Sequence, residues 1–190
     1  MITTDTASPE PPVTRAEFRA HLRLSEGFPE DTAEDALLDR LLAAATAQVE
    51  TRLAQLLVAR EVTLTVDRWS ASGHLVLPVG PVAAIDSLVL LRDGETVALD
   101  AAGLVIEPGR TRQRVTAPGG APLPAVPSGG RAEAIFTAGH GATGADVPED
   151  LRQAVLLLAA RQFEDRDGAD SPGLPAPVAA LLAPHRPIRL

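Results

Sequence analysis

One stretch of this sequence matches a motif with known chemistry, the G-x-G-x-x-G run GHGATG at residues 139–144. Between a strand and a helix, such a run binds the pyrophosphate of a dinucleotide when the helix begins within the glycines. Here residues 145–147 separate the glycines from the next predicted helix, and Asp146 stands at its cap, where a carboxylate repels phosphate. No further strand follows that could carry an acidic residue to a ribose. The sequence therefore favours an ordinary strand-to-helix turn over a nucleotide site.

The other polar residues form no catalytic or metal-binding pattern. The histidines stand far apart, without i, i+4 partners or carboxylates at metal-ligand spacing; they are His21, His74, His140 and His185. The acidic groups flank predicted helix ends in mixed-charge runs, as solvated surface does. There is no cysteine, which excludes disulfides and thiol nucleophiles, and no serine stands in a nucleophile-elbow context. We therefore expect no catalytic residues, metal or cofactor, and a protein that is not an enzyme.

The basic residues are all arginine, 17 in number, and three of them alternate along a predicted strand: Arg110, Arg112 and Arg114. Alternate residues of a strand share one face, so these arginines could form a nucleic-acid stripe or one side of a salt-bridged subunit interface. No aromatic residue lies between them to stack on bases, and the formal net charge of -8 repels nucleic acid on average. The sequence therefore predicts a subunit interface.

Length and composition favour a single domain with an aliphatic core. The chain has 190 residues, of which 45% are hydrophobic and only 3% aromatic, and one domain usually spans about 100 to 200 residues. No run approaches the roughly 18 apolar residues of a membrane span, and the first residues lack the basic and apolar regions of a signal peptide. We therefore expect no membrane contact and no export signal.

Two helical segments enclose a block of short strands. Apolar residues recur at steps of three and four between residues 14 and 57 and again between 147 and 183, which predicts helices there. From about residue 60 to 141 the period changes to two, and Asp93-Gly94 marks a hairpin turn. The predicted fold class is α+β: a long-helix bundle with an inserted small antiparallel β-sheet or barrel.

Polar or proline-rich segments lie at both ends of this domain. Residues 1–12 have little apolar surface and predict a flexible arm, so the domain itself spans residues 13–190. Residues 184–190 are extended by their prolines and carry two arginines with apolar neighbours. Such a tail usually binds a partner.

The chain resembles the head-tail connector (adaptor) proteins of long-tailed phages and gene transfer agents. The resemblance runs in order from about residue 13 to the C-terminus, and these segments carry it: AHLRL, EDALLDRLLAAATAQVETRLAQLL, LPVGPVAAIDSLVLL, FTAGHG, VPEDLRQAVLLLAARQFEDR and PAPVAALLAPHRPIRL. It departs where family members often carry aromatic residues and this chain has His140, Gln162 and His185.

The resemblance implies a structural protein of the particle neck, assembled in the bacterial cytoplasm. Members form a dodecameric ring beneath the portal protein, extend the DNA channel and present a surface to the stopper and tail-completion proteins. Packaged DNA passes through the ring without sequence-specific binding. By analogy, the portal-docking tail comprises Arg186, Pro187, Ile188, Arg189 and Leu190. Two alternatives are a stopper or tail terminator, and a nucleotide-binding enzyme that uses the turn at 139–144.

Overall fold

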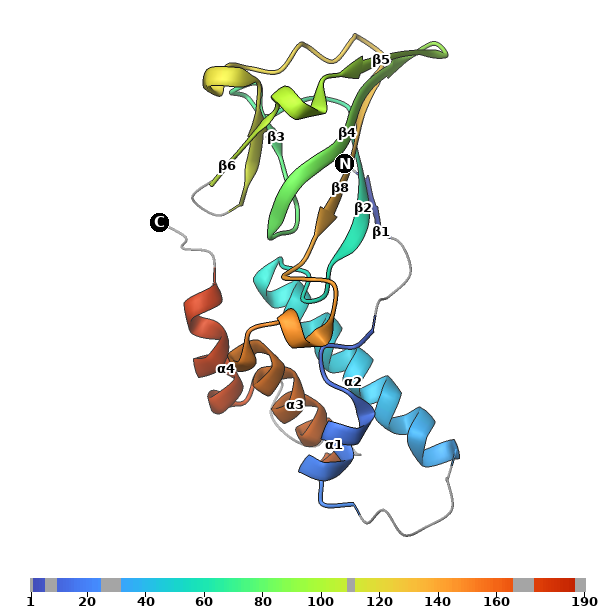
Figure 1. Ribbon diagram of the computed structural model, residues 1–190, viewed down its shortest axis with the longest axis vertical. Helices are drawn as coiled ribbons and strands as arrows, with labels where there is room; N and C mark the ends of the chain where they lie inside the picture. Colours follow the sequence, from blue (N-terminus) through green and yellow to red (C-terminus); the bar gives the residue numbers. More distant parts are fainter. Residues whose placement is uncertain (1, 6–9, 25–31, 109–111, 166–172, 187–190) are drawn as a thin grey trace.

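The computed structural model describes residues 2–5, 10–24, 32–108, 112–165 and 173–186 (Figure 1). Helices gather at one end of the long axis and strands at the other, so the described chain has the α+β class that the sequence predicted. The sheets are open, so the predicted alternative of a barrel is not found among these residues. None of the helices in these ranges has the length and apolar character needed to cross a membrane.

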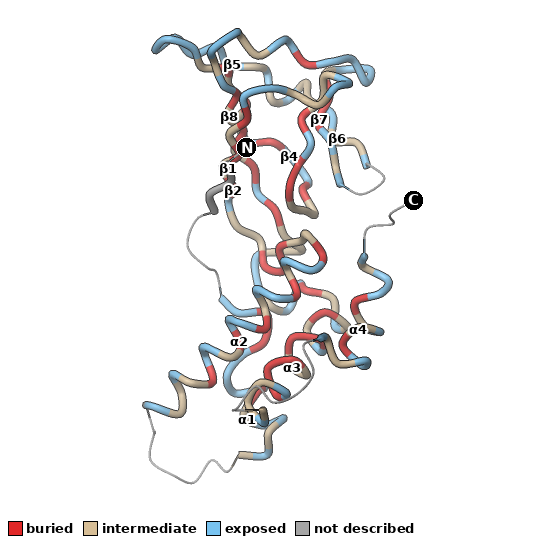
Figure 2. Tube along the Cα trace, turned by 180° about the vertical axis from the view of Figure 1, so that it is seen from behind, coloured by how far each residue is buried: buried red, intermediate tan, exposed pale blue. Residues whose placement is uncertain are grey.

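Within the described residues, the helical end contains four α-helices around one apolar core. These are α1 (Arg15–His21), α2 (Thr32–Leu53), α3 (Glu149–Glu164) and α4 (Ala176–Leu182). Apolar residues at helical spacing in α2 and α3 face each other, and Phe18 of α1 is completely buried between them. Figure 2 shows the resulting buried stripe along the inner side of each long helix.

Helix α1 is fastened to its neighbours by its cap and by arginine ion pairs. A capping box begins the helix, since Thr14 and Glu17 exchange hydrogen bonds. Arg15 binds Asp35 and Asp39 of α2 at 2.5 and 2.9 Å. Arg152 of α3 donates a hydrogen bond to the backbone oxygen of Pro12 at 3.0 Å. The short helix therefore has a fixed orientation across α2 and α3.

The other end contains two antiparallel sheets. The larger has the order β1-β2-β8-β4-β5, and the smaller has the order β3-β7-β6. The strands are β1 (Ile2–Asp5), β2 (Arg60–Val66), β3 (Leu75–Val76), β4 (Val82–Arg92), β5 (Glu95–Leu99), β6 (Val105–Glu107), β7 (Arg114–Thr116) and β8 (Arg131–Ala138). A second apolar core lies under these sheets, with Phe136 of β8 completely buried in it.

The local signals of the strand block are confirmed. Alternate residues of β2 are buried, as the period of two predicted: Val62, Leu64 and Val66. Asp93 and Gly94 join β4 to β5 with φ values of +49° and +85°. Positive φ at both central residues defines a type I′ turn, whose twist suits a hairpin.

The first residues differ from the sequence expectation of a flexible arm over residues 1–12. Ile2–Asp5 form β1 and pair antiparallel with β2, from Ile2 opposite Thr65 to Asp5 opposite Val62. Pro12 and Val13 are buried against the helices. Composition did not reveal this, because backbone pairing with a strand some 60 residues away supplies the hydrogen bonds.

Candidate functional site at the junction and the root of the tail

The glycine turn at residues 139–144 is packed against the protein's own chain. Gly139 has φ of +140°, and a Cβ atom there would lie 2.4 Å from the Cα of Ala59. At Gly141 it would lie 2.2 Å from the Cβ of Asp146, and at Gly144 it would lie 2.9 Å from the backbone oxygen of Pro12. The space that each absent side chain leaves is therefore filled by the protein's own chain and not by a ligand.

Hydrogen bonds hold this turn between the two cores. The backbone N–H of Gly139 donates to Pro81 at 2.9 Å, that of His140 donates to Leu57 at 3.1 Å, and that of Ala59 donates to Gly141 at 2.7 Å. The turn then closes with a capping box between Thr143 and Asp146, whose N–H···O distance is 2.9 Å.

The carboxylate of Asp146 keeps its charge within this turn. Hydrogen bonds from the backbone and side chain of Thr143 hold the pKa of Asp146 below its usual value. A charged carboxylate beside the glycines repels an anionic ligand. This electrostatic result agrees with the steric one, and both argue against the nucleotide-binding alternative.

Four polar residues from distant parts of the chain converge at the root of the C-terminal tail. His185, in the 3₁₀ turn Ala183–His185 that follows α4, donates from Nε2 to Oδ2 of Asp150 at 2.6 Å. The side-chain amide of Gln55, just beyond α2, donates to the backbone oxygen of His185 at 3.2 Å. His140 of the glycine turn lies close enough to both His185 and Asp150 to interact with their charges.

The electrostatics of this cluster favour a charged Asp150 and a neutral His140. Burial lowers the pKa of His140, and the nearby His185 lowers it further. Burial tends to raise the pKa of Asp150, but the hydrogen bond and charge of His185 outweigh this and hold that pKa below its usual value. In the described residues, Nε2 of His140 and Oε1 of Gln55 are buried without a hydrogen-bond partner. The cluster therefore retains polar atoms that its own chain does not satisfy.

This cluster was not predicted from the sequence. The histidines are isolated along the chain but not in space, because residues 140, 150 and 185 meet only after α3 and α4 pack. No local pattern relates them. Among the described residues, no group of three or more potential ligands could hold a metal ion.

Arg186 begins the predicted docking tail and lies exposed beside a groove. The groove has a volume of about 1010 Å³ and runs between α2 and the segment before α4; its lining residues are Ala47, Gln48, Thr51, Arg52, Gly173, Leu174 and Arg186. Two arginines thus stand at one opening. The other tail residues of the prediction, Pro187, Ile188, Arg189 and Leu190, lie outside the described residues.

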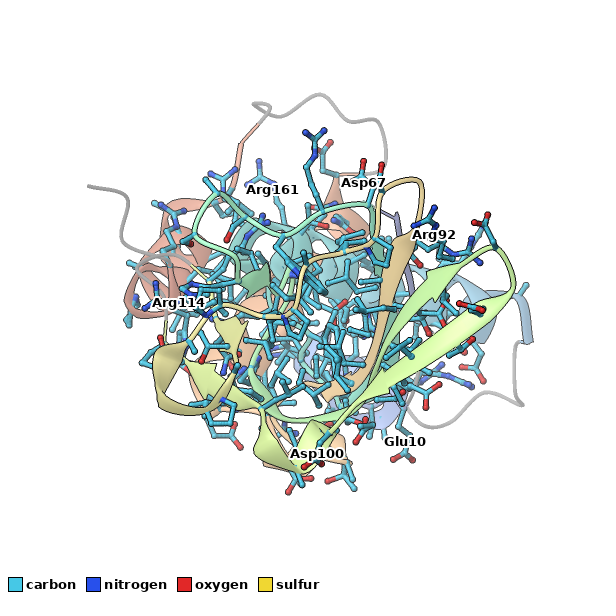
Figure 3. All side chains as sticks on the ribbon, turned by 90° about the horizontal axis from the view of Figure 1, so that it is seen from above. Glu10, Asp67, Arg92, Asp100, Arg114 and Arg161 are labelled. Carbon is cyan, nitrogen blue, oxygen red and sulfur yellow. The ribbon has the colours of Figure 1, made fainter. Side chains whose placement is uncertain are left out.

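The structure describes two of the three arginines that were predicted to form a subunit interface. Arg114 lies in β7 and pairs with Glu107 of β6, with N···O distances of 2.7 and 2.9 Å. Arg112 precedes that strand and is exposed, while Arg110 lies outside the described residues. Seen from above, Arg114 lies at the periphery of the sheet end, as do Arg92 and Asp100 (Figure 3).

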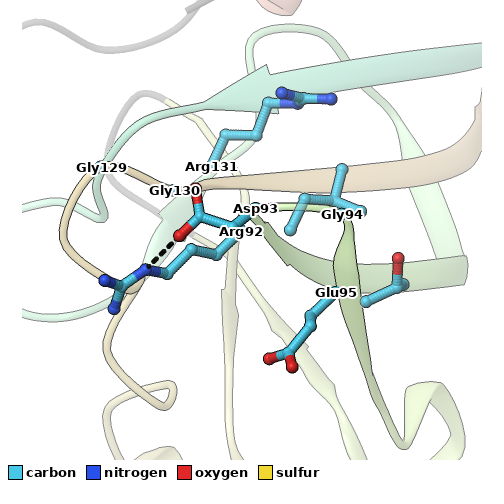
Figure 4. A pocket seen from close by; sticks show the side chains of 9 residues that line it. Arg92, Asp93, Gly94, Glu95, Gly129, Gly130 and Arg131 are labelled. Atoms are coloured by element: carbon cyan, nitrogen blue, oxygen red, sulfur yellow. Dashed lines mark hydrogen bonds and ion pairs between the residues drawn. The ribbon is translucent and has the colours of Figure 1, made fainter.

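A smaller hollow lies at the tip of the β4–β5 hairpin. Its volume is about 320 Å³, and it is bordered by residues 91–96 and 129–131. Arg92 and the neighbouring Asp93 form an ion pair at 3.2 Å there, and Glu95 points to another side (Figure 4). Exposed charges of both signs without a buried member give this hollow no catalytic character.

Replacing Gly141 by alanine should destabilise the protein because the new methyl group would collide with Asp146. We expect the free energy of unfolding to fall by about 1–3 kcal/mol, measured by urea denaturation. Gly173→Ala is the matched control, since nothing lies within 4 Å of its Cβ position and its φ is not restrictive. Equal stability of the two variants would contradict the structural role of the turn.

Replacing Asp150 by asparagine should loosen the root of the tail. We expect a loss of about 0.5–1 kcal/mol at pH 7, because the pair with His185 is partly exposed. Since the pKa of Asp150 is lowered in the folded protein, its contribution is present above the unfolded pKa and is lost as the pH falls through the folded value. Denaturation curves at pH 5 should therefore separate the two proteins, and the separation should shrink as the pH falls below the usual pKa range of an aspartate. Glu149→Gln, which removes an exposed carboxylate next in the chain, is the control and should show less effect.

Comparisons with known proteins indicate which class of protein this chain is similar to. No protein-family model matches it, and no curated protein matches it. It is similar over its full length to a chain from a structure described as the neck of an empty gene transfer agent (GTA) particle with C6 symmetry. That chain has 39% identity and a TM-score of 0.87, with 100% of this chain and 97% of the other covered.

Two further solved structures agree. A chain from the virion of a native gene transfer agent (GTA) particle has 38% identity and a TM-score of 0.83, and one from the neck of a native GTA particle with C12 symmetry has 36% and 0.79. Both cover 100% of this chain and 97% of theirs. Identity of this size over the whole chain is shared ancestry as well as a shared fold, and the protein belongs to the family of neck proteins of gene transfer agent particles.

Proposed function

We propose that this protein is the head-tail connector (adaptor) of a gene transfer agent or related phage-like particle. In this role it forms a dodecameric ring beneath the portal, extends the DNA channel, and joins the capsid to the tail without catalysing a reaction. The similarity to neck chains over the whole of this chain carries the proposal. Those structures have C6 and C12 symmetry, and a ring of twelve copies satisfies both, because twelvefold symmetry contains sixfold symmetry.

The portal is the proposed partner of the C-terminal tail, Arg186 to Leu190. Contacts of His185 with Asp150 and Gln55 support this role, because they fix the point from which the tail leaves the helical end. Arg186 is exposed at that point and stands beside a groove that also contains Arg52. A tail with a fixed root loses less conformational freedom on binding than one that is free along its whole length.

The other contacts of the ring are proposed from charge and exposure. Arg112 and Arg114 lie at the sheet end and would face a neighbouring copy, together with Arg110. The stopper or tail-completion protein would bind the ring on the side away from the portal. The net charge of -8 suits a channel through which packaged DNA slides without sequence-specific binding.

Deleting the gene in a producing strain tests the proposed role. We expect negative-stain microscopy to show portal-bearing heads beside free, unattached tails, because the connection between them is missing. Complementation with the intact gene should restore tailed particles. Complete tailed particles from the deletion strain would rule out the connector role. Tails that are isolated with a neck ring still attached would instead indicate that the missing protein is a stopper or tail terminator.

Ending the chain after Arg186 tests the tail separately. The contacts of His185 remain in this variant, so we expect an unchanged melting temperature together with loss of portal binding in a co-sedimentation assay. A full-length variant with residues 187–190 replaced by Gly-Ser-Gly-Ser shows whether length or side chains matter, and we expect it to fail as well. Portal binding at the wild-type level by the shortened chain would refute docking through the tail.

A further inference from the structure

The larger sheet ends in two strands that are open on their outer sides. Its order is β1-β2-β8-β4-β5, so β1 pairs only with β2 and β5 pairs only with β4 within the described residues. An open edge presents backbone N–H and C=O groups that can pair with another chain. The two edges are different, which makes the sheet capable of head-to-tail addition.

The turn geometry identifies which backbone groups β5 offers. Asp93 and Gly94 form a two-residue turn, so Arg92 and Glu95 are the pair that closes it by hydrogen bonds. Hydrogen-bonded pairs alternate with non-bonded pairs along an antiparallel ladder. The pair of Leu91 with Thr96 and the pair of Val89 with Ala98 are therefore non-bonded. Thr96 and Ala98 direct their backbone N–H and C=O groups away from β4.

Strand β5 has few of the features that protect an edge from pairing. Its first four residues are exposed, and its sequence ETVAL contains no proline and a single charge. Val97 is 56% exposed although it lies opposite Leu90, which is 7% exposed. The apolar side of the sheet thus continues onto β5 and is left uncovered there.

A ring built by rotation brings unlike edges together. A closed ring needs a heterologous contact, in which one surface of a copy meets a different surface of the next. Each strand in the sheet runs opposite to its neighbour, so β1 and β5, four steps apart, run in the same direction. Between copies related by a modest rotation, β5 of one would therefore lie parallel to β1 of the next.

We propose that β5 of one copy pairs in parallel with β1 of the next copy, which joins the five-stranded sheets around the ring. This inference rests on the proposed ring and names the contact that closes it. The two edges can be compared through the central strand β8, to which β2 connects β1 and β4 connects β5. In this register, β1 lies level with residues 133–136 of β8, and β5 lies level with residues 131–134 of β8. The two edges are thus offset by two residues, or roughly 7 Å. Strands tilted relative to the ring axis accommodate such an offset, as they do in closed barrels.

Cross-linking tests the contact in assembled particles. This chain has no native cysteine, so only the introduced cysteines can link its copies to one another. Particles carrying Thr4→Cys and Ala98→Cys should give a ladder of covalent multimers after treatment with a short bis-maleimide, because adjacent strands lie about 4.8 Å apart. Each single variant should stay monomeric on a denaturing gel. The control double variant pairs Thr4→Cys with Arg40→Cys on exposed α2, and it should also stay monomeric.

Each contrary result has a distinct meaning. Dimers from Ala98→Cys alone would show two β5 edges paired with each other, and monomers from the double variant in intact particles would show that the edges do not meet. Either result overturns the inference while leaving the connector role standing. Complete particles from the gene-deletion strain would overturn the connector role itself.

A proline substitution gives a second test that needs no cross-linker. Ala98→Pro removes an N–H that points away from β4, so the fold keeps its own ladder and should melt at nearly the wild-type temperature. We expect at least a tenfold lower yield of tailed particles. Ala98→Ser retains the N–H and should assemble normally. A folded proline variant that assembles at the wild-type yield would refute pairing through β5.

Discussion

Glu50 and Arg60 tie the last turn of α2 to the first residue of β2, and the relation between the two ends of the molecule depends on this ion pair. The guanidinium binds both carboxylate oxygens at 3.0 and 2.9 Å, with the side chains only 14% and 11% exposed. The carboxylate also accepts the backbone N–H of Leu57 at 2.9 Å. Bidentate pairing fixes direction as well as distance. The backbone of Val58 and Ala59, held in this way, is the surface against which Gly139 packs when the chain returns from the sheets.

Two apolar cores, one among the helices and one under the sheets, lie on either side of the Glu50–Arg60 pair. The helical end and the sheet end can therefore make different contacts. Leu57 and Val58 belong to the helical core, whereas Leu56, one residue earlier, belongs to the core of the sheets. The cores therefore meet within a single turn of chain. The Glu50–Arg60 pair and the hydrogen bonds of the glycine turn therefore join the helical end, which carries the tail root at His185, to the sheet end, which carries the edge strand β5. The proposed ring subunit, which would bind a portal with one end and its neighbours with the other, would need its two ends to be joined in this way.

Local signals predicted much of the fold, and distant contacts explain the rest. The apolar stripe of α2 and the turn at Asp93-Gly94 are each encoded within a few residues, and both appear in the structure. Strand β1 was missed because its partner lies some 60 residues away, and the cluster of His140, Asp150 and His185 was missed for the same reason. The glycine turn resembled a nucleotide site because sequence shows where side chains are absent and not what fills the space.

If the proposed ring forms through β5, the isolated chain must avoid this association away from the particle. An edge such as β5, with only Glu95 to protect it and Val97 exposed, would pair at random if nothing opposed it. The net charge of -8 supplies a general repulsion between copies in solution. This repulsion is spread over the surface and weakens with salt, whereas strand pairing is short-ranged and directional. In the proposed assembly, a portal that gathers copies side by side would overcome the first effect and satisfy the second, so that assembly would be favoured at the particle and disfavoured away from it.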